Sequence, residues 1–365
     1  MRLLIEAANT ALGVVDGRIV EPSGSFDVRL RIPGGELRPG LINAHDHLHR
    51  NHYGRLGAPP YANAYEWGRD IHAREGDAIA RARALPRRDA LLRGAWKNLR
   101  AGVTTVVHHD APEADFAQYF PIGVAPLATA HSLGFASAPL PSALTEPFAI
   151  HLAEGIDADS ADEIRELDRG GLLTSNLIAV HAVCADADGI ERFRRSGAAV
   201  TWCPTSNAFL FARTAPMALL AEGVDVMLGS DSLLTGQGSL LDEVRCARAL
   251  GLLSDARIAD AVGAVAARRL RLPEPTLTVG ARADVIVLTR PLLEATDADV
   301  ALVICDGNLR LLAPALLDQL GTRAECGRVT PSGGVRKWVY GGRSERSASL
   351  SRKRTDPDTT RRSRL

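Results

Sequence analysis

The sequence predicts an α/β protein built on a TIM-like (β/α)₈ barrel, with a small β-sandwich domain formed from both ends of the chain. Three observations support this prediction. Apolar strand segments alternate with helical segments from residue 40 to residue 265, short strands and tight turns occupy both chain ends, and no glycine-rich nucleotide fingerprint follows the first strand. A length of 365 residues and a hydrophobic content of 46% suit one large domain with a small satellite.

The central part of the chain supplies the barrel. Its predicted strands are residues 40–47, 104–109, 122–128, 148–153, 176–183, 198–203 and 224–230. Its predicted helices are residues 88–101, 160–169, 187–196, 215–222, 240–250 and 257–265. This alternation indicates a parallel sheet, and the strand count favours a barrel over an open doubly wound sheet. An eighth strand is expected within residues 135–144, where strand signals are weak, so the fourth barrel unit is expected to be short or irregular.

The two chain ends differ from the central part in their pattern, because short apolar runs alternate there with turns. Asp16-Gly17 is a strong hairpin signal in the first 38 residues, and Asp306-Gly307 repeats it near the other end. We therefore expect three regions. Residues 1–38 and 276–340 form one composite β domain, residues 39–275 form the barrel, and residues 342–365, which are poor in large apolar side chains, form a disordered tail.

Composition excludes several classes of function. Lys and Arg number 43 and Asp and Glu number 43, so the zero net charge attracts neither nucleic acid nor an anionic membrane. The five cysteines are scattered and form no Cys-x-x-Cys pair, which indicates reduced thiols and a cytoplasmic protein. No apolar stretch is long enough to cross a bilayer, and the first residues read as a strand and not as a signal peptide.

Polar side chains stand at the ends of several predicted strands. His45 and His47 are two positions apart, so in a strand both imidazoles point to the same side, and imidazole is a favoured ligand of zinc and iron. His151, His181 and Asp231 end three later strands, with Glu154 three residues after His151. Each alone is explained as well by a buried core histidine or a helix cap. Catalytic residues collect at the carboxyl ends of barrel strands, and together these residues predict one site.

At these residues the chain resembles the amidohydrolase superfamily, in the branch of N-heterocycle deaminases and chlorohydrolases that includes guanine deaminase. The matching segments are residues 39–47, 151–154, 180–183, 200–207, 228–231 and 279–287. The resemblance covers residues 2–312, and its last segment belongs to the composite β domain in that family.

The resemblance implies one divalent metal ion, held by His45, His47, His151 and Asp231, with zinc preferred and iron(II) as the alternative. Glu154 and His181 would line the substrate side. In this scheme Asp231 takes a proton from water, Glu154 carries a proton to a ring nitrogen and then to the leaving amine, and His181 orients the attacking hydroxide or stabilises charge. Binuclear members use a carboxylated lysine at a strand end. The only barrel lysine, Lys97, lies in a helical segment, which favours one metal.

The predicted function is metal-dependent hydrolytic deamination of a small polar N-heterocycle or amidine. The alternatives are a cyclic amidohydrolase that opens a lactam or imidazolone ring and a metal-binding scaffold without activity. The expected partner is a small-molecule substrate, and the resemblance implies a homo-oligomer. Residues 48–72 are expected to form an aromatic-rich loop over the site. The roles of His108, His109 and His131 stay open at this point.

Overall fold

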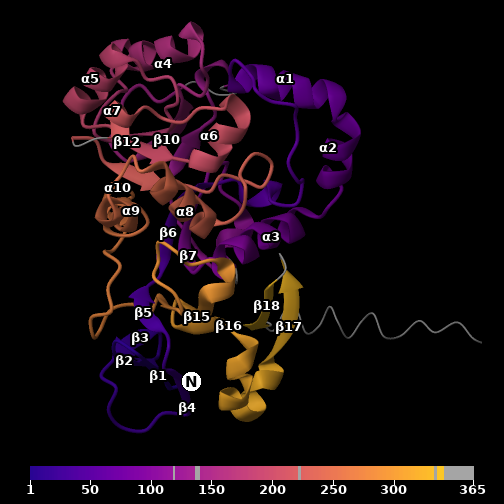
Figure 1. Cartoon of the computed structure of the whole chain (residues 1–365), viewed down its shortest axis with the longest axis vertical. Coiled ribbons are helices and arrows are strands. Elements are labelled where there is room, and N and C mark those ends of the chain that lie inside the picture. The colour runs from indigo at the N-terminus through magenta and orange to yellow at the C-terminus, as the bar shows by residue number, and fades with distance from the viewer. Residues whose placement is uncertain (118–119, 136–139, 221–222, 333–334, 341–365) are drawn as a thin grey trace, which may run out of the picture.

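The computed structural model describes residues 1–117, 120–135, 140–220, 223–332 and 335–340 (Figure 1). The predicted tail, residues 342–365, lies outside the described residues. So does part of the stretch in which an eighth strand is expected. Among the described residues, no helix has the length and apolar character needed to cross a membrane.

Two parallel sheets lie in the larger part of the molecule and position the candidate site. Their strands are β6 (Leu41–Asp46), β7 (Val103–His108), β8 (Gly123–Val124), β9 (Ala128–Ala130), β10 (Phe148–Leu152), β11 (Leu177–His181), β12 (Ala199–Trp202) and β13 (Val226–Leu228). Strands β6 to β8 pair in chain order in one stretch, and β9 to β13 pair in chain order in another. The predicted parallel α/β arrangement is thereby confirmed.

Two local features of these parallel sheets differ from the prediction. The third predicted strand is split into β8 and β9, which pair with different neighbours. In the described part of residues 135–144, no residue belongs to a strand. Pro141 in this stretch has no N–H group to donate to a neighbouring strand, which disfavours a strand there.

Helices follow most strands of these sheets, as the alternation predicts. They are α3 (Arg87–Arg100), α4 (Ala158–Arg169), α5 (Ala187–Ser196), α6 (Pro204–Phe211), α7 (Met217–Leu220), α8 (Leu240–Leu250), α9 (Asp255–Ala261) and α10 (Ala264–Arg269). The two ends of α5 show how capping residues determine where a helix begins and ends. The Asp186 side chain accepts a hydrogen bond from Gly189 N at the start, and Gly197, with a φ of 70°, ends the helix.

The expectation of a loop at residues 48–72 is wrong in part. Helix α1 (Ala64–Arg74) begins there, and α2 (Gly76–Arg83) follows it. Asn63 caps α1 by accepting a hydrogen bond from Glu66 N. Only Ala64 and Ile71 of α1 are buried, so the helix has too few apolar positions to give a clear periodic signal.

The chain ends form two further sheets. The first has the order β3-β2-β1-β4 and the second the order β17-β18-β16-β15-β14-β5. The strands are β1 (Leu3–Ala7), β2 (Ala11–Val15), β3 (Arg18–Val20), β4 (Val28–Ile32), β5 (Glu36–Pro39), β14 (Val285–Leu288), β15 (Val300–Cys305), β16 (Asn308–Leu312), β17 (Gly327–Ser332) and β18 (Val335–Tyr340). At both predicted hairpin turns, 16–17 and 306–307, the two residues have positive φ, as a type I′ turn requires.

Candidate metal and catalytic site

Strand β6 delivers the first two histidines of the site. His45, Asp46 and His47 are all buried. Asp46 turns away from the two histidines, as the two-residue period of a strand predicts, and its Oδ2 lies 3.0 Å from Lys97 Nζ. Asn51 and Asn98 also donate to the Asp46 carboxylate, at 2.8 and 2.7 Å. These contacts fix the end of β6, and with it the direction of both imidazoles.

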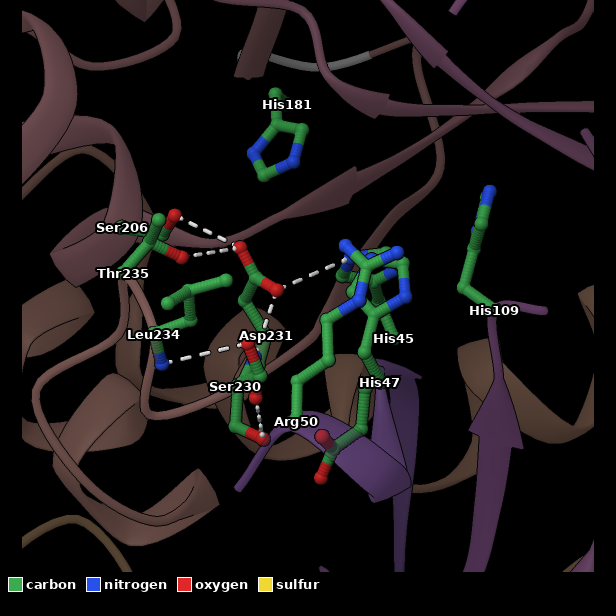
Figure 2. Close-up of polar contacts among 12 residues, drawn as sticks. His45, His47, Arg50, His109, His181, Ser206, Ser230, Asp231, Leu234 and Thr235 are labelled. Carbon is green, nitrogen blue, oxygen red and sulfur yellow. Dashed lines mark hydrogen bonds and ion pairs between the residues drawn. The ribbon is translucent and has the colours of Figure 1, made fainter. Parts of the chain in front are cut away.

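The imidazoles from three strands meet in one cluster. The ring centroids of His45, His47 and His151 lie 5.1 to 5.4 Å from one another. His181 joins them, with its ring 5.6 Å from that of His45 and 5.4 Å from that of His151. Figure 2 shows Asp231 facing His45, and the closest oxygen and nitrogen of the pair are 3.7 Å apart. The sequence-predicted residues therefore converge, although they span residues 45 to 231.

The donor atoms of this cluster are spaced as metal ligands require. Two groups have all their donor atoms within 4.8 Å of one another, namely His45 with His47 and Asp231, and His45 with His151 and His181. Both ring nitrogens of His45 are buried and have no hydrogen-bond partner among the described residues. A buried polar atom without a partner is costly, and a bound cation would remove that cost.

The charge states of these residues also suit a cation. Burial holds the pKa of His47 and of His151 well below 6.5, so both rings are neutral and keep a lone pair for a metal. Burial alone would raise the pKa of Asp231, but the neighbouring His45 and the Thr235 hydroxyl outweigh it and keep the pKa below its usual value. Three neutral imidazoles and one carboxylate form a donor set that zinc and iron(II) both accept.

Glu154 stands beside the cluster at the exit of β10. Its Oε1 lies 3.5 Å from His181 Nε2, and the side chain is buried. Burial raises its pKa to about 7, against the opposing effect of His181. A carboxyl group with this pKa both takes up and releases a proton near neutral pH.

The first turn of α6 holds two of these side chains in place. Asn207 Oδ1 accepts a hydrogen bond from His181 Nδ1 at 2.8 Å, which leaves Nε2 without a proton in the neutral ring. Ser206 Oγ donates to Asp231 Oδ2 at 2.8 Å, and Thr235 Oγ1 donates to the same oxygen at 2.7 Å (Figure 2). Sequence reasoning gave these three residues no role. The signal for two of them is the matching segment 200–207, which contains Ser206 and Asn207.

The structure gives different positions to the three histidines whose roles the sequence leaves open, His108, His109 and His131. His109 points into the cluster, with its ring 4.1 Å from that of His151, and its Nε2 donates to Ala130 O at 2.7 Å. His108 points to the other side of β7 and accepts a hydrogen bond from Leu48 N. His131 lines the adjoining cavity and stacks on His151 at 6.0 Å.

A third group, His49, His108 and Asp110, also has donor atoms within 4.8 Å of one another. Because the Leu48 N–H occupies Nδ1 of His108, the ring proton is on Nε2, and neither nitrogen is free to bind a metal. Asp110 has a different contact, since its Oδ2 lies 3.3 Å from His47 Nδ1. A carboxylate at this nitrogen orients the ring so that Nε2 faces the cluster.

Lys97 lies in helix α3, as predicted, and not at a strand end. Its Nζ donates to Asp231 O at 2.6 Å and to Ser230 Oγ at 3.0 Å, in addition to the ion pair with Asp46. The ammonium group therefore supports the cluster from behind, and Lys97 belongs to neither of the two donor groups.

A cavity of about 580 Å³ opens beside the cluster. His47, His151, Glu154, His181 and Asp231 line its inner end. The apolar and aromatic side chains Tyr53, Leu56, Trp67, Ile71, Ile79, Phe135 and Leu234 line the rest, together with Arg50, Arg69, Arg83 and Arg87. Most of this wall comes from residues 48–87, so the expectation that the segment after β6 faces the site is correct, although helices α1 and α2 form much of it.

Comparison with known proteins decides the family. Residues 145–310, which include His151, His181 and Asp231, match the sequence model of the amidohydrolase family. This chain carries an amidohydrolase family domain. The resemblance stated from the sequence motifs is therefore confirmed.

The curated relatives that this chain matches in part include deaminases. The chain is 34% identical to a 5-methylthioadenosine/S-adenosylhomocysteine deaminase of Halobacterium salinarum over 164 residues, which are 38% of each chain. It is 40% identical to an aminodeoxyfutalosine deaminase of Deinococcus radiodurans over 89 residues, 24% of this chain and 21% of the relative. These matches span less than half of either relative.

Solved structures share the fold over most of the chain. An adenosine deaminase from Xanthomonas campestris with bound zinc has a TM-score of 0.67 at 21% identity, over 87% of this chain and 94% of the other. An atrazine chlorohydrolase from Arthrobacter aurescens complexed with zinc has a TM-score of 0.63 at 16% identity, over 84% and 94%. At these identities the likeness concerns the fold alone.

Proposed function

We propose that this amidohydrolase removes an amino group hydrolytically from a small polar N-heterocycle, with aminopurine nucleosides as the first candidates. The observation that supports this most is Glu154. A carboxyl group with a pKa near 7 lies beside, and not within, a set of metal-type donors in a cavity wide enough for a nucleoside. The names of the curated relatives, which are deaminases of adenosine-like compounds, agree with this choice.

In this proposal His45, His47, His151 and Asp231 hold one divalent cation, with zinc preferred and iron(II) as the alternative. These residues are distributed over the two donor groups that share His45. When bound, such a cation lowers the pKa of a water molecule and so provides hydroxide near neutral pH. Two observations support this assignment. The ring nitrogens of His45 have no hydrogen-bond partner among the described residues, and the rings of His47 and His151 are neutral.

The chain's own residues move the protons. Asp231, which keeps its charge to low pH, accepts a proton from the attacking water. Glu154 delivers its proton to the ring nitrogen next to the attacked carbon, takes a second proton from the hydroxyl group now on that carbon, and passes it to the departing amine. The proton held by Asp231 then returns to Glu154, which restores the starting state. His181, whose Nδ1 is occupied by Asn207, presents the lone pair of Nε2 to the water and orients it.

We also infer the finer architecture that the resemblance implies. Residues 39–275 would form a closed barrel, and residues 1–38 and 276–340 a composite β domain. Closure is supported by a hydrogen bond of 3.0 Å from Asp231 N, just after β13, to His45 O in β6. The composite domain is supported by one apolar cluster that contains Ile5 and Leu30 from one chain end and Val285 and Leu302 from the other. The homo-oligomer implied by the resemblance remains a prediction.

The test is an ammonia-release assay on zinc-loaded protein with a panel of aminoheterocycles, including 5′-methylthioadenosine and adenosine. We expect turnover of at least one member. We also expect Glu154→Gln to lower kcat by about 100-fold or more with zinc content unchanged, because the amide cannot carry a proton. Asp159→Asn, at an exposed position of α4, is the matched control and should keep full activity.

Other outcomes would contradict the proposal in distinct ways. Formation of a carboxylate from cyclic amides without ammonia would indicate the ring-opening alternative. Zinc binding without turnover of any substrate in either panel would indicate a non-catalytic scaffold. Full turnover by Glu154→Gln would show that the assigned proton carrier is wrong.

A further inference from the structure

A second cavity, of about 430 Å³, lies between helix α3 and the strands β16, β17 and β18. Figure 1 shows α3 next to β17 and β18, at the junction between the parallel sheets and the sheet of the chain ends. Five lining side chains are cationic: Arg93, Lys97 and Arg100 from α3, Arg328 from β17 and Lys337 from β18. No carboxylate is among the lining residues. In a chain of zero net charge, this is a local concentration of positive charge.

The carboxylates behind the cavity neutralise only part of this charge. Lys97 pairs with Asp46 at 3.0 Å, and Arg100 lies 3.8 Å from Asp297. Among the described residues, no carboxylate lies within ion-pair distance of Arg93, Arg328 or Lys337. At least three cations therefore face the same cavity without a counter-charge in contact.

Lys337 is the most informative of the three, because only 3% of it is exposed. Its Nζ donates to Ala298 O at 3.1 Å and to Val300 O, both of which are neutral carbonyl groups. Burial lowers the pKa of this amine to about 8. Asp297 and Asp299 act against this effect, but neither is within ion-pair distance of Nζ. A buried ammonium group whose direct partners are neutral carbonyls is stabilised when an anion binds beside it.

This cavity is separate from the catalytic one, although the two share a wall. No residue lines both. Ser232 and Leu234 line the catalytic cavity, whereas Leu233 between them lines the second. Leu233 N donates to Asn51 Oδ1 at 3.1 Å, and Lys97 Nζ reaches Asp231 O. An occupant would therefore lie directly behind the loop that carries Asp231.

We propose that this second cavity binds a small divalent oxyanion, such as sulfate or a phosphate group, free or as the head group of an organic ester. The exposed guanidinium groups of Arg93 and Arg328 can each donate two parallel hydrogen bonds to such an anion. The buried ammonium group of Lys337 adds a third positive charge to the cavity wall. Trp96, Leu233 and Val339 form apolar walls that suit the organic part of an ester.

Equilibrium dialysis of the metal-loaded protein against radiolabelled sulfate, at ionic strength held constant with NaCl, tests this proposal. We expect saturable binding of one sulfate per chain. The double variant Arg93→Gln, Arg328→Gln should weaken binding at least tenfold, and both side chains are exposed, so the fold should tolerate the changes. Arg81→Gln, an exposed position on α2 that lines neither cavity, is the matched control and should bind as the unmodified protein does.

Removal of the metal with a chelator distinguishes this site from the catalytic one, and sulfate binding should persist. Loss of binding with the metal, an unchanged affinity in the double variant, or no saturable binding above the NaCl background would each overturn the proposal. Displacement of sulfate by phenyl phosphate and by inorganic phosphate identifies the source. Stronger displacement by phenyl phosphate indicates an organic ester, and equal displacement indicates the free ion.

Discussion

At the scale of single residues, the candidate site depends on neighbouring side chains that hold the predicted residues in position. His181 has Asn207 at Nδ1 and Glu154 near Nε2, so Asn207 sets the position of the ring proton, and Glu154 is the residue proposed to exchange protons with the substrate. Asp231 is held in the same way by Ser206 and Thr235. Through these hydrogen bonds Asn207 orients the His181 ring, and Ser206 and Thr235 orient the Asp231 carboxylate.

Asn207→Ala tests this arrangement. Without the acceptor at Nδ1, the His181 ring can rotate or place its proton on Nε2, and we expect kcat to fall by about 10- to 100-fold. The zinc content and KM should change little, because His181 is not among the proposed ligands. Asn207→Asp, which keeps an acceptor at this position, should restore most of the rate. Equal rates for Asn207→Ala and the unmodified protein would contradict the role of Asn207. The measurement is steady-state kinetics with metal content determined on the same samples.

At the scale of elements, the first turn of helix α6 is connected both to the site and to helix α8. Thr205, next to Ser206 and Asn207, donates from N to Glu243 Oε2 at 2.9 Å and from Oγ1 to Glu243 Oε1. Glu243 belongs to α8 and is fully buried, and burial raises its pKa to about 8. The position of α6 is therefore linked to the protonation of a residue that never reaches the cavity.

This link predicts a dependence of stability on pH. The folded chain holds the Glu243 proton to about pH 8, whereas the unfolded chain releases it near pH 4.5, so the unfolded state binds fewer protons between these values. The contribution to folding is therefore fully present below pH 4.5 and is lost as the pH rises to 8.

Glu243→Gln should remove this dependence, because glutamine cannot release a proton and still offers an acceptor to Thr205 N. The measurement is urea unfolding of unmodified and variant protein at pH 6, 7 and 8. We expect the difference in unfolding free energy to shift in favour of the variant by about 2 kcal/mol over this range, because one proton over two pH units contributes at most that order of free energy. A difference that is constant with pH would contradict the assigned pKa.

Helix α1 allows a second prediction at this scale. Asn63 caps it, and the next residue, Ala64, donates from N to Glu154 O at 3.0 Å. Asn63→Ala should lower the unfolding free energy by about 1 kcal/mol through loss of the cap. Asn63→Ser keeps a capping oxygen and should cost less. Equal losses for the two substitutions, in thermal or urea unfolding, would show that the cap is not the cause.

At the scale of the whole molecule, the sequence predicts elements that have a local apolar pattern. It does not predict contacts that depend on how distant elements pack together. The strands carrying His45, His151 and His181 were predictable because buried parallel strands are continuous apolar runs. Helix α1 was missed because few of its residues are buried. The contact of Lys97 with the Asp231 carbonyl was missed because it depends on how α3 packs under the sheet, which no local pattern records.

We propose that side chains from the end of β6, from β10 and from the segment after β13 hold one divalent metal ion. Elemental mass spectrometry of protein purified without chelator measures the metal content per chain most directly. We predict about one zinc or iron ion per chain, and less than a tenth of that in His45→Ala, which removes the ligand shared by both donor groups. Two ions per chain would indicate a binuclear site, and no metal after reloading with zinc and iron would contradict the account.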